Sequence, residues 1–208
     1  MTNNDLISII TPFKNSSEFL NECLESIINQ SYLNWELIII DDYSNDNSFQ
    51  LVNNISLKDK RIKLFKNEGK KGIINCLRQG LNKCSGDYIT RMDSDDVMDK
   101  DKLKELHKSL KISGKGYVST SKVKYFSKKG LGSGYEKYEN WLNKMMVNND
   151  NFNHNHTKSN TFPKSLINGI NFFIGFGFGI RQYFIRLLSS FSHGFWQSIP
   201  LLWPRWIS

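Results

Sequence analysis

Cysteine, proline and long hydrophobic runs are all scarce in this chain of 208 residues. The three cysteines lack the paired spacing of a disulfide framework or a cysteine-based zinc site: Cys23, Cys76 and Cys84. The first residues contain no basic segment followed by a long apolar core, so we predict no secretory signal and a cytosolic protein with reduced thiols. The apolar stretch 166–180 is interrupted by asparagine and is shorter than the roughly 20 residues that span a bilayer.

Acidic residues are absent from the last part of the chain, because no Asp or Glu follows Asp150. The formal net charge is +8, and a basic surface suits nucleic acid or an anionic membrane. No aromatic and basic motif of a known nucleic-acid module is present, so we predict no nucleic-acid partner. Apolar residues make up 39% of the chain, which is enough for a folded core and excludes wholesale disorder.

Short β-rich runs alternate with amphipathic helical patterns over the first half of the sequence. We predict strands at 6–11, 36–40, 61–65 and 87–92, and helices after Ser16-Ser17, over 47–57, from Gly72 to Ser85 and over 102–111. The two serines are the candidate N-cap of the first helix. This alternation with short connections predicts an α/β fold with a mostly parallel sheet that is covered on both faces.

Polar or acidic residues follow three of the four predicted strands, at 12–15, 41–42 and 93–96. Ligands of such sheets bind beyond the carboxyl ends of the strands. Asp93 and Asp95 are hard oxygen donors two residues apart, and Mg²⁺ and Mn²⁺ bind through one or two carboxylates completed by phosphate oxygens and water. Such a metal neutralises a diphosphate leaving group. Asp42, after a neighbouring strand, is suited to accept from a base N–H or a ribose hydroxyl.

Four segments resemble, in order and spacing, the nucleotide-sugar-binding half of a family-2 glycosyltransferase: ISIITPFKN (7–15), LNECLESIINQSYLNWELIIIDDYSNDNS (20–48), KRIKLFKNEGKKGI (60–73) and GDYITRMDSDD (86–96). The resemblance implies a Rossmann-like nucleotide-binding sheet with a smaller acceptor-side region. It also implies inverting transfer of a sugar from a nucleoside diphosphate donor, with a UDP-sugar favoured, to a saccharide or lipid-linked acceptor, with Mn²⁺ or Mg²⁺ as the cofactor.

The same resemblance implies donor-binding roles for Pro12, Lys14, Asp42, Gly72, Arg78 and Asp93, and metal-binding roles for Asp93 and Asp95. Asp95 is the expected direct metal ligand. Lys14 stands where many family members carry tyrosine, so a contact with phosphate replaces base stacking there. Arg78 is shifted from the usual Arg-Asn pair and is the candidate contact to the diphosphate.

The catalytic base is not identified by the sequence. An inverting transferase needs a general base, and the family places an Asp or Glu about 90–100 residues after the metal motif, where this chain has none. A weaker similarity, through 134–141, extends to about residue 145. Two hypotheses therefore stay open, a glycosyltransferase and a non-catalytic remnant that binds nucleotide sugar without transfer. A receiver-like signalling module is excluded, because its Asp pair would follow the first strand.

The expected organisation is a nucleotide-sugar-binding domain at 1–112, a partial acceptor-side region at 113–150, and a linker with an apolar basic tail at 151–208. The tail carries apolar residues at helical spacing with nearby arginines and tryptophans, which suits a helix in a membrane interface. Alternatively it covers the sheet as core, or it is not a natural continuation of the chain. The first alternative predicts a cytoplasmic protein that is peripheral at the inner face of the membrane.

Overall fold

The architecture is taken from a computed structural model, which describes residues 5–113, 118–127, 130–147 and 171–174. The elements in chain order are β1 (Ile7–Phe13), α1 (Leu20–Ile28), β2 (Trp35–Asp41), α2 (Ser48–Ser56), β3 (Ile62–Lys66), α3 (Ile73–Lys83), β4 (Tyr88–Arg91), α4 (Lys102–Ser113), β5 (Val118–Thr120), α5 (Ser133–Val147) and β6 (Asn171–Ile174). The strands and helices predicted before residue 113 are all present.

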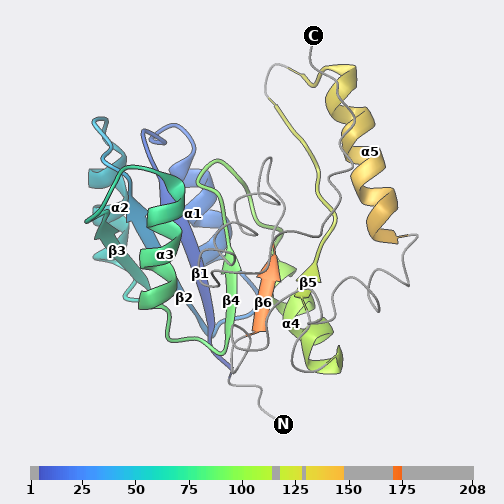
Figure 1. Ribbon diagram of the computed structural model, residues 1–208, viewed down its shortest axis with the longest axis horizontal. Coiled ribbons are helices and arrows are strands. Elements are labelled where there is room, and N and C mark those ends of the chain that lie inside the picture. Colours follow the sequence, from blue (N-terminus) through green and yellow to red (C-terminus); the bar gives the residue numbers. More distant parts are fainter. Residues whose placement is uncertain (1–4, 114–117, 128–129, 148–170, 175–208) are drawn as a thin grey trace, which may run out of the picture.

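The strands of the described residues form one sheet in the order β3-β2-β1-β4-β6-β5, and every pairing in it is parallel (Figure 1). The predicted parallel α/β fold is therefore confirmed. β6 comes from the segment that the sequence assigned to the tail, and it lies between β4 and β5. The rest of that tail, including the apolar helical pattern proposed for a membrane interface, lies outside the described residues.

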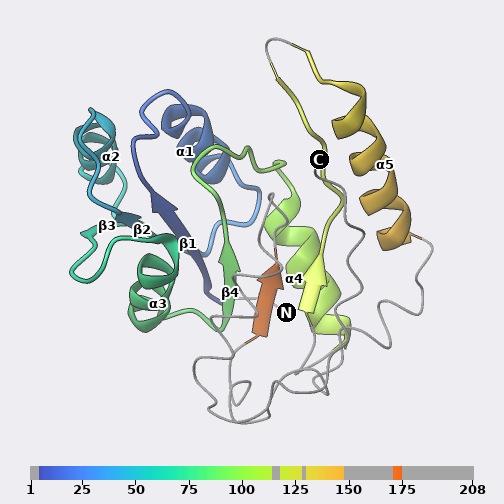
Figure 2. The same cartoon turned by 45° about the horizontal axis from the view of Figure 1, so that its top comes forward.

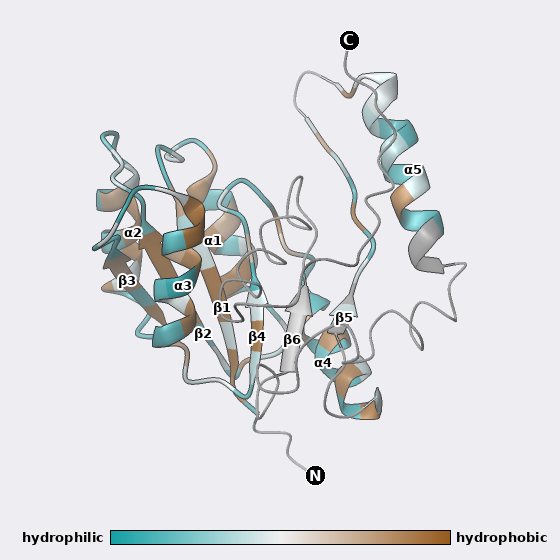
Figure 3. Ribbon diagram, viewed as in Figure 1, coloured by the Kyte–Doolittle hydropathy of each residue, from teal (hydrophilic) through white to brown (hydrophobic). Residues whose placement is uncertain are grey.

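Helices cover both faces of the sheet, as the sequence predicts. On one face, Leu24 of α1, Val52 of α2 and Leu106 of α4 pack in one cluster with Ile9 and Leu37 of the central strands. On the other face α3 packs, through Cys76 and Leu77, against the alternate residues of the same strands. Figure 3 shows the hydrophobic residues gathered on the strands and on the helix surfaces that face them.

Pro12 lies within β1 rather than ending it, although proline cannot donate a backbone hydrogen bond. The pairing of β1 with β4 ends at Ile10 and Arg91, and the carbonyl of Ile10 accepts from the N–H of Met92. Because alternate residues of a strand point to the same neighbour, the nitrogen of Pro12 faces the β4 side, where pairing has already ended. The expectation that the first strand stops at Pro12 is wrong by two residues for this reason.

Helix α5 stands apart from the sheet and its covering helices in both views (Figures 1 and 2). It is held to the segment after β5 by polar contacts. The amide of Asn143 donates to the carbonyl of Val123 at 2.7 Å and its oxygen accepts from the N–H of Val123 at 2.9 Å. Glu139 Oε2 accepts from the N–H of Tyr125 at 2.6 Å. The described residues of the region predicted as acceptor-side thus include a strand, β5, and a helix, α5.

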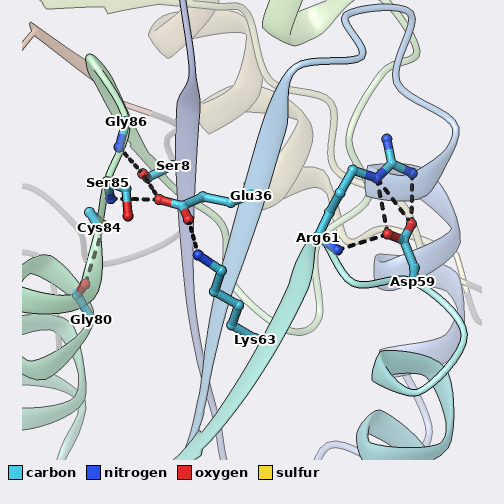
Figure 4. A network of polar contacts seen from close by, with 9 residues as sticks. All are labelled: Ser8, Glu36, Asp59, Arg61, Lys63, Gly80, Cys84, Ser85 and Gly86. Carbon is cyan, nitrogen blue, oxygen red and sulfur yellow. Dashed lines mark hydrogen bonds and ion pairs between the residues drawn. The ribbon is translucent and has the colours of Figure 1, made fainter.

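A buried carboxylate joins three strands to the connection between α3 and β4 (Figure 4). Glu36 of β2 accepts hydrogen bonds from Ser8 Oγ, from the N–H of Ser85 and from Lys63 Nζ, the last two at 2.6 and 2.7 Å. The N–H of Gly86 donates to Ser8 Oγ. Burial raises the pKa of Glu36, but the bonds from Lys63, Ser8 and Ser85 outweigh it, so the pKa lies below its usual value.

Glu36→Gln is expected to lower the free energy of unfolding by about 2 kcal/mol at pH 7, because a neutral amide cannot replace the charged acceptor. A folded-state pKa below the unfolded value of 4.5 means that the carboxylate stabilises fully above pH 4.5 and loses this contribution as the pH falls through the folded pKa. In urea unfolding, the difference in free energy of unfolding between wild type and Glu36→Gln should therefore become smaller as the pH is lowered from 7. Glu25→Gln, at an exposed position on α1, is the control. A difference in free energy of unfolding that does not change with pH would contradict a stabilising role of the charged Glu36 carboxylate.

Candidate functional site

Three loops meet at the carboxyl edge of the sheet, after β1, β2 and β4. Ser16 Oγ lies 2.9 Å from Ser94 Oγ and joins the first loop to the loop after β4. The N–H of Ser16 donates to Ser48 Oγ at 2.8 Å, and the N–H of Asn15 donates to Ser44 Oγ at 3.0 Å, which joins the first loop to the second. The acidic residues that end β2 and β4 are therefore held at one edge.

Ser16 does not cap α1, contrary to the expectation from the sequence. The N-cap residue of α1 is Phe19, and no side chain makes a cap hydrogen bond there. The Ser16 carbonyl instead accepts from the N–H groups of Phe19 and Leu20. Its hydroxyl is used to reach Ser94 across the edge of the sheet, so this serine organises the site rather than the helix.

Asp42 is a buried carboxylate that anchors the loop before α3. The N–H of Gly72 donates to both of its oxygens, at 3.0 and 2.9 Å, and Asn67 Nδ2 donates to Oδ1 at 2.7 Å. Gly72 has a φ of 132°, a conformation that residues with a side chain rarely adopt, and it is the N-cap residue of α3. Asp42 thus places a negative charge beside the N-terminus of a helix, where it is favoured.

Tyr43, directly after Asp42, was not singled out by the sequence reasoning. It has a φ of 58°, which is unusual for a bulky residue. Its hydroxyl donates to the carbonyl of Gly69 at 2.9 Å, and Lys71 Nζ lies 5.3 Å from the centre of its ring. The partly exposed ring therefore lies beside the loop that Asp42 anchors. Strained residues of this kind gather at functional sites.

Three carboxylates follow β4 within four residues. Asp95 is exposed, Asp96 is half-buried, and Asp93 accepts hydrogen bonds from the buried Arg91. Burial, together with the nearby charges of Asp93 and Asp95, raises the pKa of Asp96 to about 6. Such mutual repulsion is relieved by a cation at this edge.

The remaining residues from the sequence analysis lie at different distances from these carboxylates. Pro12 is buried in β1 and Lys14 is exposed at the start of the first loop. Arg78 is half-buried on α3, six positions after Gly72 and so about 9 Å further along the helix axis. The structure therefore brings Asp42, Gly72, Asp93 and Asp95 to one edge, whereas Arg78 belongs to a helix that covers the sheet.

Cys23 and Cys76 lie beside the acidic residues but are unsuited to nucleophilic chemistry. Burial, with Asp96, Asp95 and Asp93 nearby, raises the pKa of Cys23 to about 12. Burial, with Asp42 nearby, raises the pKa of Cys76 to about 12 as well. Both thiols stay protonated at neutral pH and contribute to packing.

A metal ion bound by protein groups alone is not supported by the described part of the chain, where no three His, Cys, Asp or Glu side chains gather to hold one. Mg²⁺ and Mn²⁺, however, often bind through one or two carboxylates, with substrate phosphates and water as the other ligands. Exposed Asp95, with Asp93 close in sequence, fits that donor set. Residues 5–113, 118–127, 130–147 and 171–174 include no helix long and apolar enough to cross a membrane.

Comparison with known proteins connects this geometry to a family. The profile described as Glycosyl transferase family 2 matches residues 8–186, which extends past residue 145, where the resemblance drawn from the motifs ends. An uncharacterized glycosyltransferase of Haemophilus influenzae is 50% identical over 103 residues, covering 50% of this chain and 41% of that protein. The chain therefore spans, in this match, about two fifths of its relative's length.

Two solved structures share the fold. Staphylococcus aureus TarS, residues 1–349 in complex with UDP-GlcNAc, is 25% identical with a TM-score of 0.52, covering 61% of this chain and 37% of that one. The mannosyltransferase PcManGT from Pyrobaculum calidifontis, in complex with GDP-Man and Mn²⁺, is 23% identical with a TM-score of 0.53, covering 59% and 37%. The second likeness concerns the fold alone.

Proposed function

The chain belongs to glycosyl transferase family 2, and we propose that it binds a nucleoside diphosphate sugar with a divalent cation and transfers the sugar to an acceptor hydroxyl. The observation that carries this proposal is the placement of Asp42 and the Asp93–Asp96 carboxylates at one edge of the sheet, where Ser16 contacts both Ser48 and Ser94. The two groups follow β2 and β4, which lie on either side of β1, so they are separated along this edge.

In this proposal the two acidic positions have different tasks. Asp42 accepts from the base or ribose, and the loop that it anchors carries Lys70 and Lys71 toward the donor. Asp95 and Asp93 hold Mn²⁺ or Mg²⁺, which neutralises the charge that develops on the diphosphate leaving group. Lys14, at the end of β1, is placed to contact phosphate. A UDP-sugar is the favoured donor, since TarS, which shares the fold, binds UDP-GlcNAc.

The acceptor is proposed to be a saccharide or a lipid-linked saccharide, with the protein acting in the cytoplasm or as a peripheral protein at the inner face of the membrane. Sedimentation with anionic liposomes tests the membrane part. We expect full-length protein to sediment with them at low salt and a variant without 175–208, which keeps β6, to stay in solution. If the full-length protein does not sediment with the liposomes, the proposed membrane association is wrong.

Calorimetric titration with UDP, GDP and dTDP, each with and without Mn²⁺, tests donor binding directly. We expect UDP to bind in the presence of Mn²⁺, and to bind at least about tenfold more weakly when EDTA removes the metal, because the carboxylates and the diphosphate then repel one another. Equal affinity with and without metal would contradict the metal-dependent site. If GDP or dTDP binds more tightly than UDP, the assignment of the donor changes, but the proposed metal-dependent site stands.

A second candidate, binding without transfer, is favoured by one observation about the acids after α4. Glu136, Glu139 and Asp150 are the only acidic residues in the sequence after α4, and they are the candidates for a general base. Of these, Glu139 already accepts a hydrogen bond from the N–H of Tyr125. General-base catalysis contributes about 10²–10⁴-fold in rate. We therefore expect slow transfer from radiolabelled UDP-sugars to a membrane extract. Turnover above about 1 s⁻¹, an ordinary enzyme rate, would exclude the second candidate.

A further inference from the structure

Arg91, the last residue of β4, is a charged side chain in direct contact with a proposed metal ligand, Asp93. It is only 6% exposed and pairs in register with Ile10 of the central strand β1. Its Nε and Nη2 atoms both donate to the same oxygen, Asp93 Oδ1, at 2.9 and 2.5 Å. Arginine is suited to this contact because its donors lie in one rigid plane.

This ion pair is poorly explained as a source of stability. Its third nitrogen, Nη1, is buried and has no hydrogen-bond partner among the residues that the structure describes. Burying a cation with an unsatisfied donor is unfavourable, and apolar residues of similar size stabilise a core as well as or better than a buried ion pair. A functional reason for a charged residue at this position is therefore required.

The geometry supplies such a reason in the orientation of Asp93. Because two nitrogens of Arg91 donate hydrogen bonds to Oδ1, rotation of the Asp93 carboxylate about its Cβ–Cγ bond is restricted. Within the described residues no hydrogen bond to Oδ2 is found, and the side chain of Asp93 is 18% exposed. Oδ2 is thus the atom of Asp93 that remains for a ligand, and it is offered in one fixed orientation.

We propose that Arg91 is a positioning residue of the donor site, which holds the Asp93 carboxylate so that Oδ2 meets the metal–diphosphate group. This inference rests on the proposed function. Partners of metal ligands act in this way in other metal sites, where removing them lowers metal affinity by about 10–100-fold.

The direction in which the affinity for Mn²⁺ changes when Arg91 is replaced distinguishes a positioning role from a purely electrostatic one. Arg91→Met removes a cation beside a cation site, so a purely electrostatic role predicts tighter binding of Mn²⁺. Positioning predicts the opposite, a loss of about tenfold or more in the affinity for Mn²⁺ in the presence of UDP. Arg91→Lys, which keeps the charge and loses the planar pair of donors, is expected to lie between wild type and Arg91→Met.

Lys102→Met is the matched control. Lys102 interacts electrostatically with Asp96 and Asp93, and its loss changes the charge near the site by the same amount without breaking the contact to Asp93 Oδ1. We expect Lys102→Met to leave Mn²⁺ binding unchanged or slightly tighter. A loss equal to that of Arg91→Met would assign the effect to general damage at the site and overturn the inference.

Electron paramagnetic resonance, which measures free Mn²⁺, gives the affinity without any turnover, and circular dichroism reports folding. A double-mutant cycle with Asp93→Asn completes the test, because the effect of Arg91→Met should disappear when Asp93 is already neutral. A full Arg91 effect in that background would contradict action through Asp93. If Arg91→Met does not fold, Arg91→Lys carries the same comparison. If wild-type protein binds UDP equally well with and without Mn²⁺, the proposed function itself is wrong. If wild-type binding depends on Mn²⁺ and the Arg91 variants bind Mn²⁺ with the same affinity as wild type, only this inference is wrong.

Discussion

Replacing Asp95 by asparagine is expected to weaken Mn²⁺-supported binding of UDP by about tenfold or more, which is about 1.4 kcal/mol. Asp95 is the exposed member of the acidic loop after β4, whereas Asp93 is paired with Arg91 and Asp96 is half-buried with a pKa raised to about 6. Asp95 is therefore the carboxylate most available to a cation that arrives with a diphosphate. A neutral amide cannot balance the charge of that ion.

Calorimetry with UDP at saturating Mn²⁺ measures this effect. Asp87→Asn is the control, because Asp87 is an exposed carboxylate at the opposite end of β4, where it accepts from the N–H of Leu6. The control should bind UDP as wild type does, and residual binding by Asp95→Asn should no longer respond to EDTA. An Asp95→Asn variant with wild-type affinity and wild-type metal dependence would remove Asp95 from the site.

The first half of the fold could be predicted because each element there has a strong local pattern. The run 37–40 is continuously apolar and lies in β2, and the apolar spacing from Leu20 onward lies in α1. β5 and β6 could not be predicted in this way. They have three and four residues, and their pairing joins segments more than 50 positions apart. Short strands in non-local pairs leave no periodic signal to read.

The candidate site was predictable where chemistry follows directly from strand ends. Asp42, Asp93 and Asp95 follow buried strands, and the carboxyl ends of parallel strands share one edge. Arg91 was missed because a charged residue inside a short strand gives no sign of burial or of its partner. The contact with Asp93 is made two residues later in the chain, but only the folded structure shows that Arg91 is buried where it makes that contact. Ser16 was misread for a related reason, since its local pattern is that of a helix cap.

Replacing Asp42 by asparagine is expected to weaken UDP binding by about 30-fold, or about 2 kcal/mol, and to leave the binding of inorganic diphosphate with Mn²⁺ unchanged. The carboxylate accepts from Gly72 and Asn67 at the start of α3, well separated in sequence from the metal-binding loop. In the proposed function it meets the base or ribose, so a ligand that lacks both should not detect its loss. Asp95→Asn, by contrast, should weaken both ligands.

Asn67→Ala separates a binding role of Asp42 from its role in anchoring the loop. This variant removes the hydrogen bond from Asn67 Nδ2 but keeps the carboxylate and its contacts with Gly72. If Asp42 binds the nucleoside, Asn67→Ala should lose much less UDP affinity than Asp42→Asn. Equal losses in the two variants would mean that the order of the 67–72 loop is what matters. A loss of diphosphate affinity in Asp42→Asn would instead show that the two ends of the site are coupled through α3, because the loop that Asp42 anchors begins that helix.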